Sequence, residues 1–147
     1  MIKLRPATIK DLELLKFWDK QQHVIDCDPD EDWDWEKELA RKPAWREQLV
    51  AELNDDPIGF VQIIDPYKRA IDIWIGEERN LNKGYGTAIM KLAIELCFSQ
   101  TEVDGILIDP LKSNTKAHKF YEKIGFEFVE ERVFNDTVCY VYELKPR

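Results

Sequence analysis

Short apolar runs separated by polar turns predict a chain of strands and amphipathic helices. Apolar residues recur at helical spacing up to Gln21, in a second stretch that ends near Ala40, and from Thr87 to Phe98. A fourth helix is predicted where Asn114 can cap its start and Gly125 can end its last turn. The remaining apolar runs predict strands at 2–5, 48–53, 58–64, 70–75, 103–108, 126–134 and 138–142.

The predicted elements follow the order β-α-α-β-β-β-α-β-α-β-β, without a repeat, a linker or a low-complexity tract. This order predicts a single domain over residues 1–147 of class α/β (α+β), with a mixed central sheet of about seven strands flanked by about four helices. The strand–helix–strand unit in the middle of the chain predicts a parallel pair of strands with a right-handed crossover.

Composition indicates a folded chain and limits the classes of partner that it is expected to bind. The sequence is 44% hydrophobic and 12% aromatic, which is enough apolar material for a core. No apolar run approaches the length of a membrane-spanning helix, and no leader-like segment opens the sequence, so we expect a soluble, cytoplasmic protein. The formal net charge of -8 argues against nucleic acid as a partner and suits a cationic one.

The cysteines predict no cross-linked or metal-bound framework. They are Cys27, Cys97 and Cys139, an odd number at wide spacing, which fits neither a set of disulfides nor a zinc site. Buried, reduced thiols are the favoured interpretation over catalysis. We expect no metal cofactor.

The segment from Ala70 to Gly86 carries the first candidate for chemistry. A strand leads into a loop, and a long amphipathic helix then opens with K-G-Y-G-T at 83–87. Glycines let the backbone turn sharply and approach a ligand closely, and the first amides of a helix carry partial positive charge. Together they predict an anion site suited to a pyrophosphate. The pattern is neither a P-loop nor a Rossmann fingerprint, and a lone G-x-G also fits a simple turn.

A second motif, N-T-K-A-H-K-F-Y-E-K-I-G-F, occupies 114–126. By itself it also fits a short capped helix with an apolar stripe. Together with L-N-K-G-Y-G-T at 81–87, in matching order and separation, it resembles the two acetyl-CoA motifs of the GNAT N-acetyltransferases. Within that family the chain is most similar to the aminoglycoside 6'-N-acetyltransferases. Leu81 stands where the wider family usually has Gln or Arg, and an apolar residue is common there in the aminoglycoside branch.

The resemblance implies a GNAT acyl-CoA N-acyltransferase fold with acetyl-CoA as the cofactor. Backbone amides at 82–87 would hold its pyrophosphate, and the strand at 73–75 would run beside its pantetheine arm. Tyr121 would point at the thioester sulfur. The residues expected at the cofactor are Ile73, Trp74, Ile75, Asn82, Lys83, Gly84, Tyr85, Gly86, Thr87, Asn114, Ala117 and Tyr121.

Acetyl transfer needs a neutral amine and a proton for the departing thiolate. The Tyr121 hydroxyl can supply that proton, and the alternative is a core aromatic. Asp72 interrupts an apolar strand next to the cofactor loop, where a carboxylate could anchor an ammonium group and accept its proton, or could simply face solvent. His118 is interpreted as an exposed helix residue rather than a base, and His23 as a favourable charge at a helix C-terminus.

An acidic stretch from Asp26 to Glu36 interleaves carboxylates with tryptophans. In the family this region covers the acceptor site, so carboxylates and aromatic rings there would suit a polycation. A solvated surface loop explains the stretch equally well. With Asp72, the candidates for substrate contact are Asp32, Trp33, Trp35 and Asp109.

The predicted function is transfer of an acetyl group from acetyl-CoA to a primary amine of a cationic small molecule, aminoglycoside-like or polyamine-like, by direct attack in a ternary complex. The alternatives are a protein or peptide N-acetyltransferase and a non-catalytic CoA-binding regulatory module. We expect a monomer or a homodimer, with neither nucleic acid nor a membrane as a partner.

Overall fold

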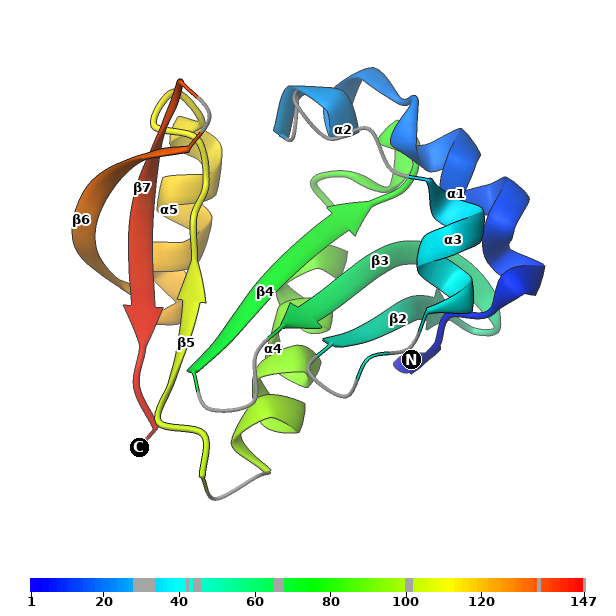
Figure 1. Ribbon diagram of the computed structural model, residues 1–147, viewed down its shortest axis with the longest axis horizontal. Helices are drawn as coiled ribbons and strands as arrows, with labels where there is room; N and C mark the ends of the chain where they lie inside the picture. Colours follow the sequence, from blue (N-terminus) through cyan, green and yellow to red (C-terminus); the bar gives the residue numbers. More distant parts are fainter. Residues whose placement is uncertain are drawn as a thin grey trace.

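A computed structural model describes residues 1–27, 34–41, 43, 46–64, 68–99, 102–134 and 136–146, with the backbone alone for residues 27, 68 and 69. Within these ranges the chain forms one mixed sheet of seven strands in the order β1-β2-β3-β4-β5-β7-β6 (Figure 1). Every predicted strand is present. The strands are β1 (Ile2–Pro6), β2 (Arg46–Leu53), β3 (Asp56–Ile64), β4 (Lys68–Ile75), β5 (Gly105–Ile108), β6 (Glu127–Phe134) and β7 (Thr137–Leu144).

Five α-helices lie in the described ranges, one more than the sequence predicts. The additional helix is α2, which begins directly after the first helix because Gln21 serves both. The Gln21 side chain donates to the Phe17 carbonyl and ends the first helix, while its own carbonyl accepts from Val24 and Ile25 and starts the second. The helices are α1 (Leu12–Asp19), α2 (Gln22–Cys27), α3 (Trp35–Ala40), α4 (Tyr85–Phe98) and α5 (Thr115–Ile124), with 3-10 turns η1 (Ile9–Asp11) and η2 (Glu78–Asn80).

Apolar side chains divide between the two faces of the sheet because successive strand residues point to opposite sides. On one face α4 and α5 cover a core that contains Val61, Ile71 and Ile89. On the other face α1, α2 and α3 cover a second core that contains Trp18 and Trp74. Figure 1 shows α1 and α3 in front of the sheet and α4 and α5 behind it.

The parallel pair predicted from the central crossover is confirmed between β4 and β5, and it is short. Residues 68–70 pair with residues 105–107. β4 then continues to Ile75 against β3, while β5 ends at Ile108 and pairs on its other side with β7. Beyond Ala70, β4 has no β5 partner in the described register, and Figure 1 shows the two strands diverging from that point.

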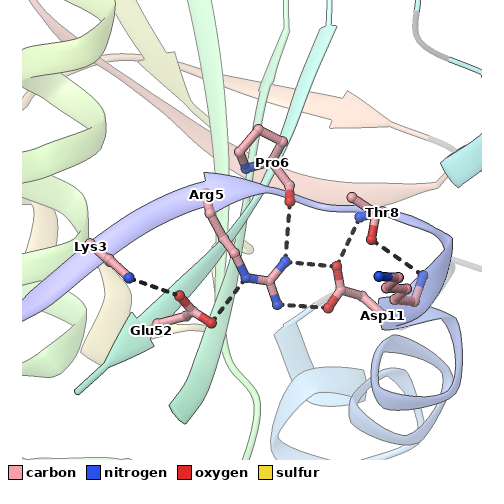
Figure 2. Close-up of polar contacts among 7 residues, drawn as sticks. Lys3, Arg5, Pro6, Thr8, Asp11 and Glu52 are labelled. Atoms are coloured by element: carbon pink, nitrogen blue, oxygen red, sulfur yellow. Dashed lines mark hydrogen bonds and ion pairs between the residues drawn. The ribbon is translucent and has the colours of Figure 1, made fainter. Parts of the chain in front are cut away.

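An ion-pair network joins β1 to the first helical turn (Figure 2). The Arg5 guanidinium donates to the two carboxylate oxygens of Asp11 at 2.9 and 2.8 Å, and its Nε donates to Glu52 at 3.0 Å. The Thr8 N–H donates to Asp11 at 2.8 Å and completes a capping box at the start of η1. Burial opposes ionisation of the Asp11 carboxyl, but the hydrogen bonds from Arg5 and Thr8 outweigh burial and lower its pKa.

Candidate active site

β4 presents backbone groups along the edge that β5 leaves. Along an antiparallel ladder, residues whose backbone groups bond the neighbouring strand alternate with residues whose groups point away from it. The Gly76 N–H bonds the Ile58 carbonyl of β3 at 3.0 Å, so the backbone groups of Ile75 and Ile73 point away from β3. The backbone groups of Trp74, which lies between these two residues, point towards β3. The edge therefore offers main-chain donors and acceptors to an extended ligand.

His23 on α2 forms a hydrogen bond to the last residue of this edge, Ile75. Its Nε2 lies 2.7 Å from the Ile75 carbonyl oxygen, and because a carbonyl only accepts, the ring donates from Nε2. The prediction that His23 acts as a charge at the end of the first helix was wrong, because α2 was not predicted. The two partners lie 52 positions apart, so no local pattern could have revealed this contact.

The turn before α4 leaves the first amides of the helix open to an anion. Asn82 and Gly84 adopt positive φ angles of 61° and 81°. No side chain caps the helix at Gly84, so the amides of Tyr85, Gly86 and Thr87, which have no acceptor within the helix, face outward. A Cβ built on Gly84 would meet no atom within 4 Å, so a ligand can approach this backbone closely. The exposed residues of the turn are Asn82, Lys83 and Gly84.

α5 reaches the same place from the second motif. A Cβ built on Gly86 would lie 3.7 Å from the Phe120 ring, so the first turn of α4 and the middle of α5 are neighbours. Tyr121 is half-buried, and its ring meets those of Phe120 and Phe126 edge-on, at centroid distances of 5.1 and 5.7 Å. The structure therefore brings the two motifs together beside the core of the α4 face.

The start of α5 confirms one prediction and corrects another. Asn114 Oδ1 accepts from the Ala117 N–H at 3.2 Å, which is the predicted cap. His118 was predicted to be exposed, and it is buried at 9% exposure. Its Nε2 donates to the Lys112 carbonyl at 2.9 Å, and its ring packs 4.8 Å from that of Tyr140. The prediction failed because β7 covers this side of α5.

A polar row crosses three strands on the face covered by α1, α2 and α3. Gln48, Gln62 and Asp72 are neighbours in register on β2, β3 and β4. Gln48 Nε2 donates to Gln62 Oε1 at 3.1 Å, and Gln62 Nε2 donates to Asp72 Oδ2 at 3.3 Å. Gln62 is only 3% exposed and Asp72 is half-buried. A buried amide thus orients the Asp72 carboxylate. Gln62 is a polar residue inside an apolar strand, and this pattern could have identified it as a candidate site residue from the sequence.

Two of the three tryptophans predicted at ligands, Trp35 and Trp74, lie in the core beside this row. Trp35 is 2% exposed and packs edge-on against Phe60 and Trp74, at centroid distances of 5.3 and 5.5 Å. Its Nε1 donates to Asp19 at 3.3 Å. Trp74 is 6% exposed and points to the same face. Both rings therefore form the packed base on which this face of the sheet is built.

The other predicted substrate residues are only partly visible. Asp32 and Trp33 lie outside the described residues. At the edge of that segment, Asp34 accepts from the Lys37 N–H at 3.2 Å and caps α3. Asp109 directly follows β5 at an exposed position. The pKa of Arg132 is raised mainly by the hydrogen bond and charge of Glu130, and Asp109 adds to this effect, which places Asp109 near β6.

Two kinds of feature are missing from the part of the chain that the structure describes. No group of three or more His, Cys, Asp or Glu residues there could hold a metal ion. None of its helices is long and apolar enough to cross a membrane. Cys97 and Cys139 are buried, as the sequence predicts.

Comparisons with known proteins agree with this geometry. The family model described as an acetyltransferase (GNAT) domain matches residues 8–134. The aminoglycoside N(6')-acetyltransferase type 1 of Klebsiella pneumoniae is 30% identical over 86% of this chain and 74% of that protein. An L-amino acid N-acetyltransferase of Escherichia coli K12 is 29% identical over 86% of this chain and 83% of that protein. A crystal structure of an aminoglycoside 6'-acetyltransferase with coenzyme A and kanamycin matches with a TM-score of 0.87 and 28% identity, over 99% of this chain and 95% of that chain.

Proposed function

This chain belongs to the GNAT family of acetyltransferases, and on that basis we propose that it moves the acetyl group of acetyl-CoA to a primary amine of a cationic small molecule. The acceptor is of the aminoglycoside or polyamine kind, and the amine attacks directly in a ternary complex. The observation that carries the proposal is the Asp72 carboxylate, which Gln62 orients on β4 next to the edge that β5 leaves.

Acetyl-CoA fits two features of the described chain. The uncapped start of α4, with its open approach at Gly84, suits the pyrophosphate. The backbone groups of Ile73 and the N–H of Ile75 suit the amides of the pantetheine arm, because an extended chain can pair with an open strand edge, while the Ile75 carbonyl already accepts from His23. When bound, the cofactor supplies an acetyl group activated as a thioester. The chain's own residues position that thioester and handle the protons.

The two candidate catalytic groups come from opposite faces of the sheet. Asp72 lies on the face covered by α1, α2 and α3, in register with Gln62, whereas Tyr121 packs from α5 against the core of the α4 face. β4 runs between them, and its edge beyond Ala70 has no β5 partner in the described register. A thioester lying along this edge could be approached from both faces, whereas a fully paired sheet would separate the two groups.

The proposed reaction removes two protons from the amine and adds one to the departing thiolate. The Asp72 carboxylate holds the ammonium group of the acceptor and takes its proton, which leaves a neutral amine to attack the acetyl carbonyl. The Tyr121 hydroxyl donates a proton to the sulfur as the carbon–sulfur bond breaks. The attacking nitrogen loses a second proton as the amide forms, and this proton restores the Tyr121 hydroxyl through solvent, while Asp72 releases the first proton to solvent. The products are an N-acetylated amine, a free thiol and one proton.

Two observations favour a cationic acceptor. The chain carries a formal net charge of -8, which attracts cations. Similar proteins are named aminoglycoside acetyltransferases, and one of them was solved with kanamycin. The similarity to an L-amino acid N-acetyltransferase makes the amino group of a free amino acid the second candidate.

The deciding experiment is thiol release from acetyl-CoA by the purified protein against a panel of aminoglycosides, polyamines, L-amino acids and short peptides, with mass spectrometry of each product. We expect the fastest release with polycationic amines. Release with amino acids alone would favour the second candidate, and release with peptides alone would favour a peptide acetyltransferase. If no amine reacted while CoA still bound, the catalytic proposal would be wrong and a CoA-binding module would remain.

A further inference from the structure

Seven of the eight residues of the edge strand β6 are exposed, and the eighth, Glu130, is half-buried. The strand stands at the end of the sheet order, and none of its residues from Glu127 to Phe134 is buried. Apolar side chains lie open on it, with Phe128 at 53% exposure, Val129 at 50% and Val133 at 62%. Open edge strands are usually shortened, covered or protected by charge, because their backbone groups can pair with another chain. The outer edge of β6 therefore offers backbone groups with which another strand can pair.

Its sequence is nearly a palindrome in chemical character. Residues 128–134 read F-V-E-E-R-V-F, with Glu131 at the centre. Outward from Glu131 stand first Glu130 and Arg132, which carry opposite charges, then two valines, then two phenylalanines. An antiparallel pair of identical strands reads the same residues in reverse. Such a sequence is therefore complementary to itself.

We infer that β6 pairs antiparallel with β6 of a second copy of this chain, with Glu131 at the two-fold axis, so that one sheet continues across a homodimer. In this register each Glu130 lies opposite the Arg132 of the other copy. Val129 likewise lies opposite Val133. Opposite charges and matched apolar residues directly across a strand pair both stabilise the pairing. The interface is isologous, as a two-fold dimer requires.

The orientation of the side chains agrees with this register. Residues directly opposite each other in an antiparallel pair share one face of the sheet. Glu130 and Arg132 do share a face, because they stand opposite Val141 and Cys139, two positions apart on β7. They also contact each other within the chain at 2.7 Å. In the dimer the two intrachain pairs would join into a network of four alternating charges.

Glu131 would meet its own copy at the axis, and the structure supplies the compensating charge. Lys112 Nζ lies 2.9 Å from Glu131 Oε1, so each copy brings a cation to this position. The neighbouring registers match less well. An axis at Arg132 would oppose two arginines, and an axis at Glu130 would oppose two glutamates, and both would set charged residues against apolar ones.

A bulge between Phe128 and Glu130 limits the length of the match. Bulges bend an edge strand and disturb its pairing locally. Val129 is the extra residue of this bulge, so the regular pairing is confined to residues 130–132 around Glu131, with Val129 and Val133 at its two ends. An interface of this size predicts a dimer that forms at micromolar concentration rather than an obligate one.

A cysteine at the axis tests the register. Directly opposite Cα atoms in an antiparallel pair are about 4.5–5.5 Å apart, which is within reach of a disulfide. Under mild oxidation the Glu131→Cys variant should form a covalent dimer in high yield. Glu127→Cys is the matched control on the same strand, because its two copies would lie roughly 27 Å apart in this register. It should remain monomeric on a non-reducing gel.

Charge exchange tests the complementarity. By sedimentation velocity the wild type should shift with concentration from 17.4 kDa to twice that mass. Arg132→Glu and Glu130→Arg should each weaken self-association about tenfold or more, because each sets like charges opposite one another. An equimolar mixture of the two variants should regain the dimer, because each new residue then meets an opposite charge. Lys91→Glu, the same charge change at an exposed position of α4, should not affect association.

Three results would overturn the inference: a wild type that stays monomeric at every concentration, a dimer that Glu131→Cys does not cross-link, or charge variants that associate as well as the wild type. Circular dichroism and thermal denaturation would show that each variant is folded. The inference does not depend on the acetyl acceptor.

Discussion

The Nε2 atom of His23 donates a hydrogen bond to the carbonyl oxygen of Ile75 at 2.7 Å, which ties α2 to the end of the β4 edge. If this edge holds the pantetheine arm, His23 acts as a positioning residue. We predict that His23→Ala weakens CoA binding about fivefold, since one hydrogen bond is worth about 1 kcal/mol. Isothermal titration calorimetry with CoA measures the effect. His23→Gln keeps a donor and should retain most of the affinity. Wild-type affinity in His23→Ala would remove the positioning role.

Tyr121→Phe is expected to lower kcat about 100-fold, because general acid catalysis contributes roughly that much. The ring contacts with Phe120 and Phe126 persist in the variant, so the Kd for CoA should not change. Tyr142→Phe is the matched control. It also removes one hydroxyl, which donates to Glu122 at 2.9 Å, and should leave kcat unaltered. Equal kcat values for Tyr121→Phe and the wild type would rule out the acid role.

Asp72→Asn replaces the carboxylate with a group of the same shape. We predict that it raises the KM for the amine about tenfold or more, because a charge-assisted bond to the ammonium is lost. The rate of the variant should also rise more steeply with pH, since the amine must then lose its proton without help. Initial rates over an amine and pH series measure both effects. Asp56→Asn, at the exposed start of β3, should behave like the wild type. An unchanged KM in Asp72→Asn would contradict the anchor.

Gly76→Ala should destabilise the fold by about 2 to 3 kcal/mol, because overpacking of a filled core has roughly that cost. A Cβ on Gly76 would lie 2.1 Å from Cε2 of Trp18, whose ring is fully buried. Gly86→Ala is the contrast, since its Cβ would meet only Phe120 at an ordinary 3.7 Å. Urea denaturation compares the two. A Gly76→Ala protein as stable as the wild type would show that the Trp18 ring can move.

Tyr142 gives a test at alkaline pH. Burial and the hydrogen bond to Glu122 raise its pKa from 10.0 to about 12. The folded state therefore keeps this proton where the unfolded state loses it, so the stabilising contribution is complete below pH 10 and lost as pH rises towards 12. We predict that the free energy of unfolding of the wild type falls across this window and that Tyr142→Phe falls less steeply. Parallel slopes for the two proteins would contradict the raised pKa.

Local patterns were enough to predict most of the fold. Short apolar runs marked all seven strands, and the Asn114 cap marked a helix start that the structure confirms. These signals depend on residues within a few positions of each other, so a sequence displays them directly. The two cofactor motifs were recognisable for the same reason, since each is a contiguous turn or helix end.

Contacts between distant segments escaped sequence analysis. His118 was predicted to be exposed, and β7 buries it. α2 was missed because one residue, Gln21, ends α1 and starts the next helix without a break in the pattern. Gln62 orients Asp72 across two strands, a relation that depends on the register of β3 with β4. The catalytic roles of Asp72 and Tyr121 stay predictions.

The sequence by itself determined the order of the strands along the chain, the family and the residues that open the cofactor helix, because periodicity and turn chemistry are local. Only the tertiary structure decided where β4 leaves β5, which face Asp72 occupies and which histidines are buried. These features depend on side chains brought together from positions tens of residues apart. Their energies come from burial and pairing, which no single segment of the chain contains.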